Sequence, residues 1–230
     1  MLVLETFPPA LGILSPSQFC LKADALLTLS GLPFARETAL PQKAPLGKLP
    51  VLRDGAERLA DSVRIERHLR LAHGFDADAG LDARARGEAQ AYRCMLEEHL
   101  YFIMHHTRWI ARPEITREVF LGRLPEAVRE AAFAQIQAKM ARDLEGQGLG
   151  RHAEEDLLAF GRADLEALAL RLGEGPFFFG ETPHSIDTTL FGFLENLVTI
   201  ALDGPLEAAA RAHPELVAFC ARFRERVYGG

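Results

Sequence analysis

The segment GKLPVLRDGAERLADS, residues 47–62, decides the fold of this chain. Its runs LPVLRD and ERLA have the length and composition of short strands, and Asp54 and Gly55 between them form the dipeptide most favoured in tight hairpin turns. Directly afterwards Asp61 and Ser62 offer side-chain oxygens that can cap a helix. The segment therefore predicts a β-hairpin that leads straight into a helix.

The residues before this hairpin predict a strand, a helix and a second strand. Residues 2–7 form an apolar run that two prolines close, as expected of a short buried strand. Residues 19–32 carry apolar side chains at helical spacing, with Gly31 as the helix stop. Residues 34–40 alternate like an edge strand. The N-terminal part is thus expected to have the order βαβ followed by ββα.

Beyond Gly74 the sequence changes character, because only helical periodicity follows the polar linker FDADAG. We therefore expect two domains, an α/β domain over residues 1–74 and an all-helical domain over residues 80–230. The expected helices of the second domain lie within residues 82–110, 126–148, 154–173, 185–202 and 214–228.

Composition excludes several classes of function. A formal net charge of −6 over 230 residues provides no basic field to attract nucleic acid or an anionic membrane surface. The three distant cysteines, Cys20, Cys94 and Cys220, argue against a disulfide framework and for a reducing compartment, so we expect a cytoplasmic protein. The beginning of the chain lacks a signal-peptide pattern, and no apolar run is long enough to span a membrane. No membrane association is expected.

The hairpin segment resembles the corresponding part of the glutathione S-transferase superfamily, in which a proline precedes the third strand and an acidic residue and a serine open the next helix. The resemblance implies a thioredoxin-like N-terminal domain that binds glutathione, followed by the helical transferase domain. It implies a cis bond before Pro50, backbone pairing of Val51 with the cysteinyl part of glutathione, and binding by Lys48, Asp61 and Ser62. Simple helix capping is the alternative role for the last two residues.

The segment SPSQFCLK, residues 15–22, lies where thioredoxin-like proteins carry their active residue. Alignment with the C-P-F-C pattern of that superfamily implies that Ser17 is the catalytic residue, with Ser15 as the alternative. A serine at the start of a helix can donate a hydrogen bond to the glutathione sulfur and favour the thiolate. Cys20 is expected to be a packed thiol, because no second cysteine stands at the C-x-x-C spacing.

The helix expected over residues 82–110 contains Tyr101, His105 and Trp109, which we predict to line a pocket for a small hydrophobic substrate. The alternative is an ordinary core helix whose histidines have hydrogen-bond partners. Histidines seven residues apart on this helix lack a third ligand at the close spacing of zinc sites, so no metal is expected.

The motif HSIDTTLFGFL, residues 184–194, resembles a helix start of the superfamily's C-terminal domain, which implies a structural role for Asp187. Together with FCLKADALLTLSGLPF and the hairpin, it is most similar to the metaxin-like and failed-axon-connection-like branch. The expected function is binding of glutathione and conjugation or reduction of a hydrophobic electrophile by a homodimer. A non-catalytic binding or assembly module on the same fold is the alternative.

Overall fold

A four-stranded mixed sheet forms the base of the N-terminal domain in the computed structural model, which describes residues 1–173 and 175–229. Strands β1 (Leu2–Thr6) and β2 (Phe34–Thr38) pair in parallel, whereas β3 (Val51–Asp54) is antiparallel to both β1 and β4 (Glu57–Ala60). The strand order is β2-β1-β3-β4. With helices α1 (Gln18–Ser30) and α2 (Ser62–His73), the observed order is βαβ followed by ββα, which confirms the expected fold.

The hairpin turn lies one residue later than the sequence indicated. Asp54 still pairs with Glu57, so the loop consists of Gly55 and Ala56. Gly55 has a φ of 58°, in the left-handed region that tight hairpin turns require.

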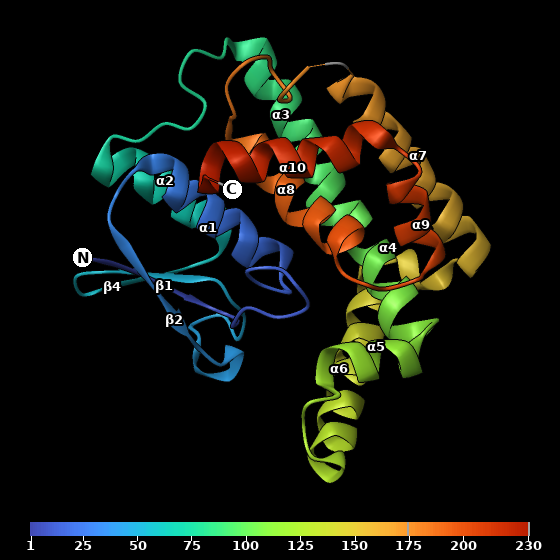
Figure 1. Cartoon of the computed structure of the whole chain (residues 1–230). Helices are drawn as coiled ribbons and strands as arrows, with labels where there is room; N and C mark the ends of the chain where they lie inside the picture. The colour runs from blue at the N-terminus through green and yellow to red at the C-terminus, as the bar shows by residue number, and fades with distance from the viewer. Residues whose placement is uncertain (174, 230) are drawn as a thin grey trace.

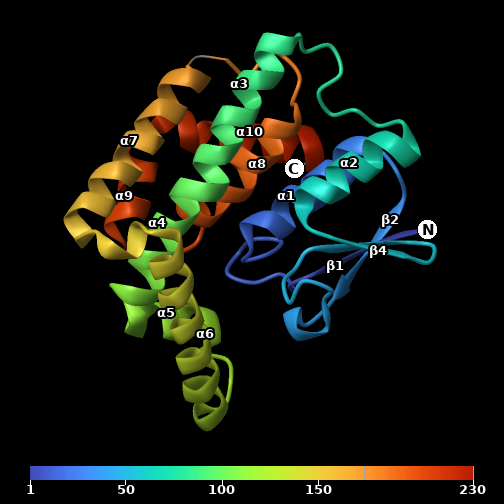
Figure 2. The same cartoon turned by 180° about the vertical axis from the view of Figure 1, so that it is seen from behind.

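Both helices of this domain cover one face of the sheet and separate it from the helical domain (Figures 1 and 2). The two helices and the sheet meet in an apolar core that contains Leu4, Leu26, Leu52, Ile65 and Leu69, all fully buried. Between β2 and β3 the chain forms only the short 3₁₀ turn Pro41–Lys43, as its wealth of prolines and glycine indicated.

The C-terminal domain is helical throughout its regular structure. Its first long rod consists of α3 (Ala83–Cys94), a π-helical stretch (Met95–Leu100), α4 (Tyr101–His105) and a second π-helical stretch (His106–Ile110). The other elements are α5 (Pro113–Leu121), α6 (Glu126–Gln147), a 3₁₀ turn (Leu149–Arg151), α7 (Glu154–Leu172), α8 (Ser185–Leu194) with its π-helical end (Glu195–Thr199), α9 (Pro205–Arg211) and α10 (Pro214–Tyr228). Helices α5 and α9 are short, begin at a proline and were not expected from the sequence.

Helix α8 is the central element of this domain, as its apolar sequence indicated. All ten of its residues are buried. Figure 1 shows α8 between α1, α3 and α10, while α5 and much of α6 project away from the rest of the molecule. Among the described residues, no helix has both the length and the apolar character that crossing a membrane would take.

Helix α1 joins the two domains by packing directly on α8. A Cβ atom added at Gly192 of α8 would lie 2.4 Å from the carbonyl oxygen of Gln18, so the backbones approach as closely as a glycine allows. On the same helix, the buried ammonium of Lys22 lies 2.6 Å from a carboxylate oxygen of Glu97 in the helical domain. This interface fixes the start of α1 relative to the helical domain.

Asp187 holds the entry into α8. One of its carboxylate oxygens accepts the Phe178 N–H at 2.8 Å, and the other accepts the His184 N–H at 2.8 Å. The helix is capped by His184 and not by Ser185, which instead donates to Asp78 of the interdomain linker through both its N–H and its hydroxyl. The structural role implied for Asp187 is confirmed, and the same helix start also secures the linker.

Replacing Gly192 with alanine should lower the free energy of unfolding by about 1–3 kcal/mol, because the new methyl group meets rigid backbone. The matched control is Gly87→Ala in α3, where an added Cβ has no neighbour within 4 Å. That change should stabilise the protein by up to about 1 kcal/mol through helix propensity. Urea denaturation of both variants measures the difference, and equal stabilities would refute the close approach of α1 and α8.

Burial raises the pKa of Asp187 to about 7, against the lowering effect of its backbone hydrogen bonds to His184 and Phe178. Since the folded pKa exceeds the unfolded one, the stabilising contribution is complete below the unfolded pKa of about 4 and is lost as pH rises through about 7. Between pH 5 and pH 8 the wild type should therefore lose about 2–3 kcal/mol of unfolding free energy relative to Asp187→Asn. Parallel urea titrations at the two pH values test this, and a constant gap between the proteins would contradict it.

Candidate functional site

The open end of the β3–β4 hairpin brings together most of the residues that the sequence singled out. Val51 pairs with Ala60, and one step further the Asp61 N–H donates to the Pro50 carbonyl at 3.3 Å. The Leu49–Pro50 peptide bond is cis, as the resemblance implied. Because α2 begins at Ser62, its N-terminus lies immediately beside this turn.

Asp61 has the backbone conformation of a strained functional position. Its φ is 90°, a value that residues other than glycine rarely adopt and that clusters at ligand sites. Its Oδ1 caps α2 by accepting the Val63 N–H at 2.9 Å, and its Oδ2 lies 3.8 Å from the Lys48 ammonium. The capping role considered for Asp61 is therefore realised, and its second carboxylate oxygen draws Lys48 to the site.

Ser62 offers a hydrogen-bonding group that the protein itself does not use. Its side chain is largely buried, yet among the described residues its hydroxyl has no hydrogen-bond partner and is not among the polar atoms sealed from solvent. A hydroxyl at the first residue of a helix lies next to unpaired backbone N–H groups that favour an anion. Lys48, whose side chain is 63% exposed, adds a cation to the same place. We call the surface formed by the turn before β3 and the start of α2, with Lys48, Leu49, Pro50, Asp61 and Ser62, the mouth.

Leu49 is a candidate that the sequence interpretation missed. Val51, which was expected to offer its backbone to glutathione, pairs with Glu5 on one side and with Ala60 on the other, so the sheet occupies its peptide groups. Leu49 is only 6% exposed, and within the described chain its N–H and carbonyl make no hydrogen bond. Buried backbone groups are almost always paired, so Leu49 is the residue here whose peptide is available to an extended ligand.

The start of α1 lies beside this mouth. Ser17 is the N-cap of the helix, and its Oγ accepts the Cys20 N–H at 3.3 Å. Ser15 is buried and accepts the Ser17 N–H at 3.4 Å, whereas Ser17 is half-buried and reaches the surface. Cys20 packs against Leu49 and Val51 in a small apolar cluster, which brings the first turn of α1 against the turn before β3.

Cys20 has the environment of a structural thiol. It is fully buried, and burial raises its pKa despite hydrogen bonds from Ser17 and Thr6 that favour the thiolate. A thiol that is both inaccessible and protonated is a poor nucleophile. Of the two side chains at the start of α1, the half-buried Ser17 hydroxyl is therefore the one that a ligand can reach.

Tyr101 and His105 lie together near the same helix. Their ring centroids are 4.0 Å apart, and Tyr101 also meets Phe19 of α1 edge-on at 5.2 Å. Burial raises the pKa of Tyr101 to about 12 and lowers that of His105 to about 3, the latter helped by the charges of Arg108 and Lys139. Both side chains are therefore neutral at ordinary pH. Tyr101 contacts the first turn of α1 through Phe19, and neither residue lines the two cavities described below.

Trp109 lies in a different aromatic group. Its ring centroid is 5.7 Å from those of both Phe120 and Phe133, on α5 and α6. The π-helical stretch His106–Ile110 begins between His105 and Trp109, and the Trp109 side chain packs with α5 and α6 instead of with Tyr101 and His105. Sequence periodicity alone assumes a uniform α-helix and carries no signal of this change.

A cavity of about 570 Å³ lies beside the loop of residues 9–14, which leads to Ser17. It is lined by the loop residues Gly12, Ile13 and Leu14, by Leu21 of α1 and by Tyr228 at the end of α10, among others. Its volume falls in the range of small-molecule sites, and apolar side chains from α1 and the loop contribute much of its wall.

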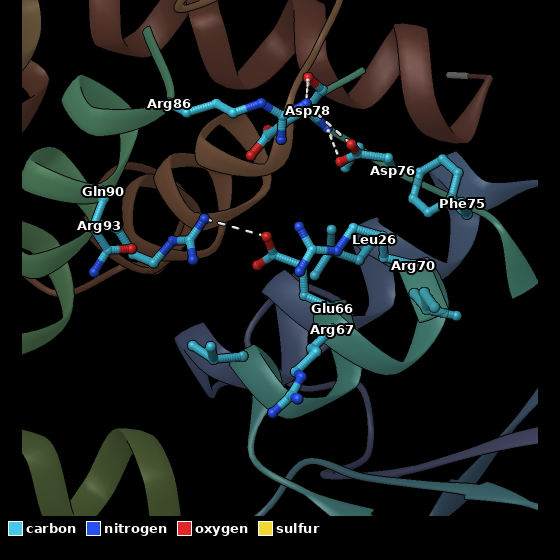
Figure 3. Close-up of a pocket in the computed structure, with 13 residues that line it drawn as sticks. Leu26, Glu66, Arg67, Arg70, Phe75, Asp76, Asp78, Arg86, Gln90 and Arg93 are labelled. Carbon is cyan, nitrogen blue, oxygen red and sulfur yellow. Dashed lines mark hydrogen bonds and ion pairs between the residues drawn. The ribbon is translucent and has the colours of Figure 1, made fainter. Parts of the chain in front are cut away.

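A second cavity, of about 320 Å³, lies between α2, the interdomain linker and α3 (Figure 3). Several of its charged side chains pair with one another. Arg93 contacts Glu66 at 3.3 Å, and Arg86 binds the Asp76 carboxylate at 3.0 Å and the Asp78 carbonyl at 2.6 Å. These contacts connect α2, the linker and α3, so we regard this cavity as part of the domain interface.

Comparison with known proteins agrees with this architecture in both halves of the chain. A family model described as the glutathione S-transferase N-terminal domain matches residues 18–115, and the glutathione S-transferase C-terminal domain matches residues 161–223. The chain belongs to the glutathione S-transferase superfamily. It is 28% identical to the isoprene-epoxide–glutathione S-transferase of Rhodococcus sp. (strain AD45), over 98% of this chain and 99% of that protein.

Other relatives of this superfamily member belong to the branch that the sequence indicated. Metaxin-1 of Macaca fascicularis is 32% identical over 84% of the chain and 67% of the relative. Failed axon connections of Drosophila melanogaster is 29% identical over 96% of the chain, which spans only 56% of that longer protein. Among solved structures, a glutathione S-transferase of Ceriporiopsis subvermispora in complex with glutathione has a TM-score of 0.69 at 16% identity, covering 97% of this chain and 96% of the other. The resemblance in structure shows the shared fold.

Proposed function

We propose that this protein binds glutathione at the mouth formed by the turn before β3 and the start of α2, and that it conjugates or reduces a small hydrophobic electrophile there. The observation that carries the proposal is the unpaired backbone of the buried Leu49, next to the unpaired hydroxyl of Ser62. A peptide ligand running antiparallel to this turn would satisfy the Leu49 N–H and carbonyl, much as an added strand does.

The charges around the mouth suit a peptide with two carboxylates. The N-terminus of α2, with the Ser62 hydroxyl, favours the carboxylate of the γ-glutamyl end. The exposed Lys48 ammonium is available to a second carboxylate, and the Asp61 oxygen near it can also accept from an ammonium group. Pro50, Val51 and Asp61 would act mainly as the scaffold of this cradle.

Ser17 is the residue that we assign to the thiol. Its Oγ already accepts from the Cys20 N–H. Its hydroxyl proton, which faces the buried Cys20 sulfur, would turn to donate to a ligand sulfur at the positive end of α1. Such a hydrogen bond stabilises the thiolate over the thiol, so the free-thiol pKa of about 8.5 shifts toward neutrality and the nucleophile is more populated at pH 7. Ser15 is the less accessible alternative, because it is 2% exposed.

The electrophile has two apolar surfaces available near Ser17. One is the aromatic pair of Tyr101, which contacts Phe19, and His105; the other is the cavity of about 570 Å³ that adjoins the loop before Ser17. The catalytic relative from Rhodococcus is named for an epoxide, a small apolar electrophile of the class that such surfaces accept. Trp109 would contribute only indirectly, through the packing of α5 and α6.

Two serine substitutions separate binding from activation. Ser62→Ala should abolish retention on immobilised glutathione, whereas Ser17→Ala should still bind but lower the conjugation rate about 10²-fold and return the thiol pKa toward 8.5. Retention, rate with a model electrophile, and thiolate absorbance against pH give the three measurements. The matched control is Ser30→Ala at the far end of α1, whose hydroxyl donates to the Leu27 carbonyl at 2.7 Å and should leave all three unchanged.

The possible results have distinct meanings. Loss of the thiolate shift in Ser15→Ala but not in Ser17→Ala would transfer the role to Ser15. Failure of the wild type to bind the matrix would contradict the proposed site and favour a non-catalytic binding or assembly module. That alternative is supported by the similarity to Metaxin-1 and Failed axon connections, whose names denote no transferase activity.

We also propose that the protein is a cytoplasmic homodimer in which the N-terminal domain of one copy contacts the helical domain of the other. The unpaired thiols of Cys20, Cys94 and Cys220, among which Cys94 is exposed, fit a reducing compartment. Twofold pairing is the commonest assembly of soluble proteins.

Sedimentation equilibrium at micromolar concentration should give twice the chain mass if this assembly forms. A buried interface should also protect exposed apolar side chains such as Leu71 of α2, so Leu71→Glu should shift the mass toward one chain. Leu170→Glu in α7, at an equally exposed leucine, is the control. A wild-type mass of one chain would remove the dimer from the proposal.

A further inference from the structure

The end of the β3–β4 hairpin carries a cluster of metal-ligating side chains that the glutathione site does not use. Nε2 of His68 lies 2.9 Å from Oδ2 of Asp54, and Nε2 of His73 lies 2.7 Å from the same oxygen. One ligand atom from each of the three residues lies within 4.8 Å of the others. The side chains are 14%, 25% and 27% exposed for His68, His73 and Asp54, so the cluster is sheltered but reachable from solvent.

Two elements of the fold create this convergence. Asp54 is the last residue of β3, directly before the turn, and both histidines belong to the second half of α2. Their rings are 5.5 Å apart and meet nearly edge-on, with both Nε2 atoms directed at the hairpin. The hairpin pairing and the packing of α2 on the sheet therefore bring together residues that are 14 and 19 positions apart in sequence.

The donor set is that of an open zinc site. Two imidazole nitrogens and one carboxylate oxygen are ligands that zinc prefers, and three protein ligands leave a fourth tetrahedral position for water. Zinc–ligand bonds of about 2.1 Å in tetrahedral geometry place the donor atoms about 3.4 Å apart. The observed spacings of 2.7 Å and 2.9 Å therefore need to open by about 0.5–0.7 Å to admit the ion.

The carboxylate of Glu57 lies near the second ring nitrogen of His68, one of the three candidate ligands. Oε2 of Glu57 lies 3.7 Å from Nδ1 of His68, the ring nitrogen that faces away from Asp54. Metal-bound histidines commonly donate their second ring N–H to a carboxylate, which fixes the ring and its tautomer. The backbone of Glu57 pairs with that of Asp54 across the hairpin, which keeps its 65% exposed side chain beside His68.

We propose that Asp54, His68 and His73 form a binding site for a divalent transition metal, with Zn²⁺ as its ion, and that Glu57 positions His68. The site is separate from the proposed glutathione mouth. His73 and Ser62 are the two ends of α2, so they stand about 16 Å apart along the helix. A bound ion would fasten the end of α2 to the hairpin, whose opposite end carries Pro50 and Asp61.

Titration of the metal-stripped full-length chain with ZnCl₂ by calorimetry tests the site. One Zn²⁺ should bind per chain, and His68→Gln and His73→Gln should each weaken binding by at least about 100-fold. Glu57→Gln should keep the stoichiometry but weaken binding about tenfold, as loss of an outer-shell carboxylate does. His152→Gln, at an exposed histidine of the helical domain, is the matched control and should bind like the wild type.

A second measurement distinguishes a metal site from a purely internal hydrogen-bond clamp. Added ZnCl₂ should raise the melting temperature of the wild type and of His152→Gln but not of His73→Gln, because an ion stabilises only a protein that binds it. Circular dichroism without metal verifies that each variant is folded. Absence of stoichiometric binding in the wild type, or equal Zn²⁺ affinity in His73→Gln and His152→Gln, would overturn the proposal and leave the cluster as a clamp.

Discussion

The packing of α1 between two cores is the constraint on which the rest of this structure depends. One side of the helix buries Ala23, Leu26 and Leu27 against the sheet. The other side meets α8, where Gly192 lets the backbones approach and where Lys22 forms a buried ion pair with Glu97. Because a helix held on two sides cannot rotate or slide without disturbing a close-packed interior, its N-terminus has one position.

That position matters because the start of α1 and the mouth of the hairpin are built against each other. Cys20 contributes no reactive thiol, but its contact with Leu49 and Val51 sets the separation between Ser17 and the turn before β3. Cys20, in the first turn of α1, thus sets the distance of the polar N-cap residue Ser17 from the turn before β3. Activation of a thiol needs this kind of preorganised hydrogen-bond donor beside the peptide-binding edge.

The helical domain contributes to the same region through rigidity as much as through contact. Asp187 satisfies two backbone N–H groups before α8 and thereby anchors the helix on which α1 rests. Ser185, two residues before it, donates to Asp78 and accepts from Arg93, so the linker, α3 and α8 share one buried polar network. Such a network, with each member hydrogen-bonded, resists relative movement of the two domains.

The sequence by itself determined the order of elements, the hairpin before α2, the central place of α8 and the membership in a superfamily, because each depends on local periodicity, turn residues or short motifs. Its motifs also assigned Ser17, Pro50, Asp61 and Ser62 to one expected glutathione site. Only the tertiary structure decided which residue beside Pro50 has backbone N–H and carbonyl groups available for a ligand. Val51 lies inside the sheet while Leu49 lies outside it, and strand register across β1, β3 and β4 is a non-local property. The packing of Trp109 against Phe120 and Phe133, and the meeting of Asp54 with His68 and His73, likewise arise from long-range packing that spacing along one helix does not encode.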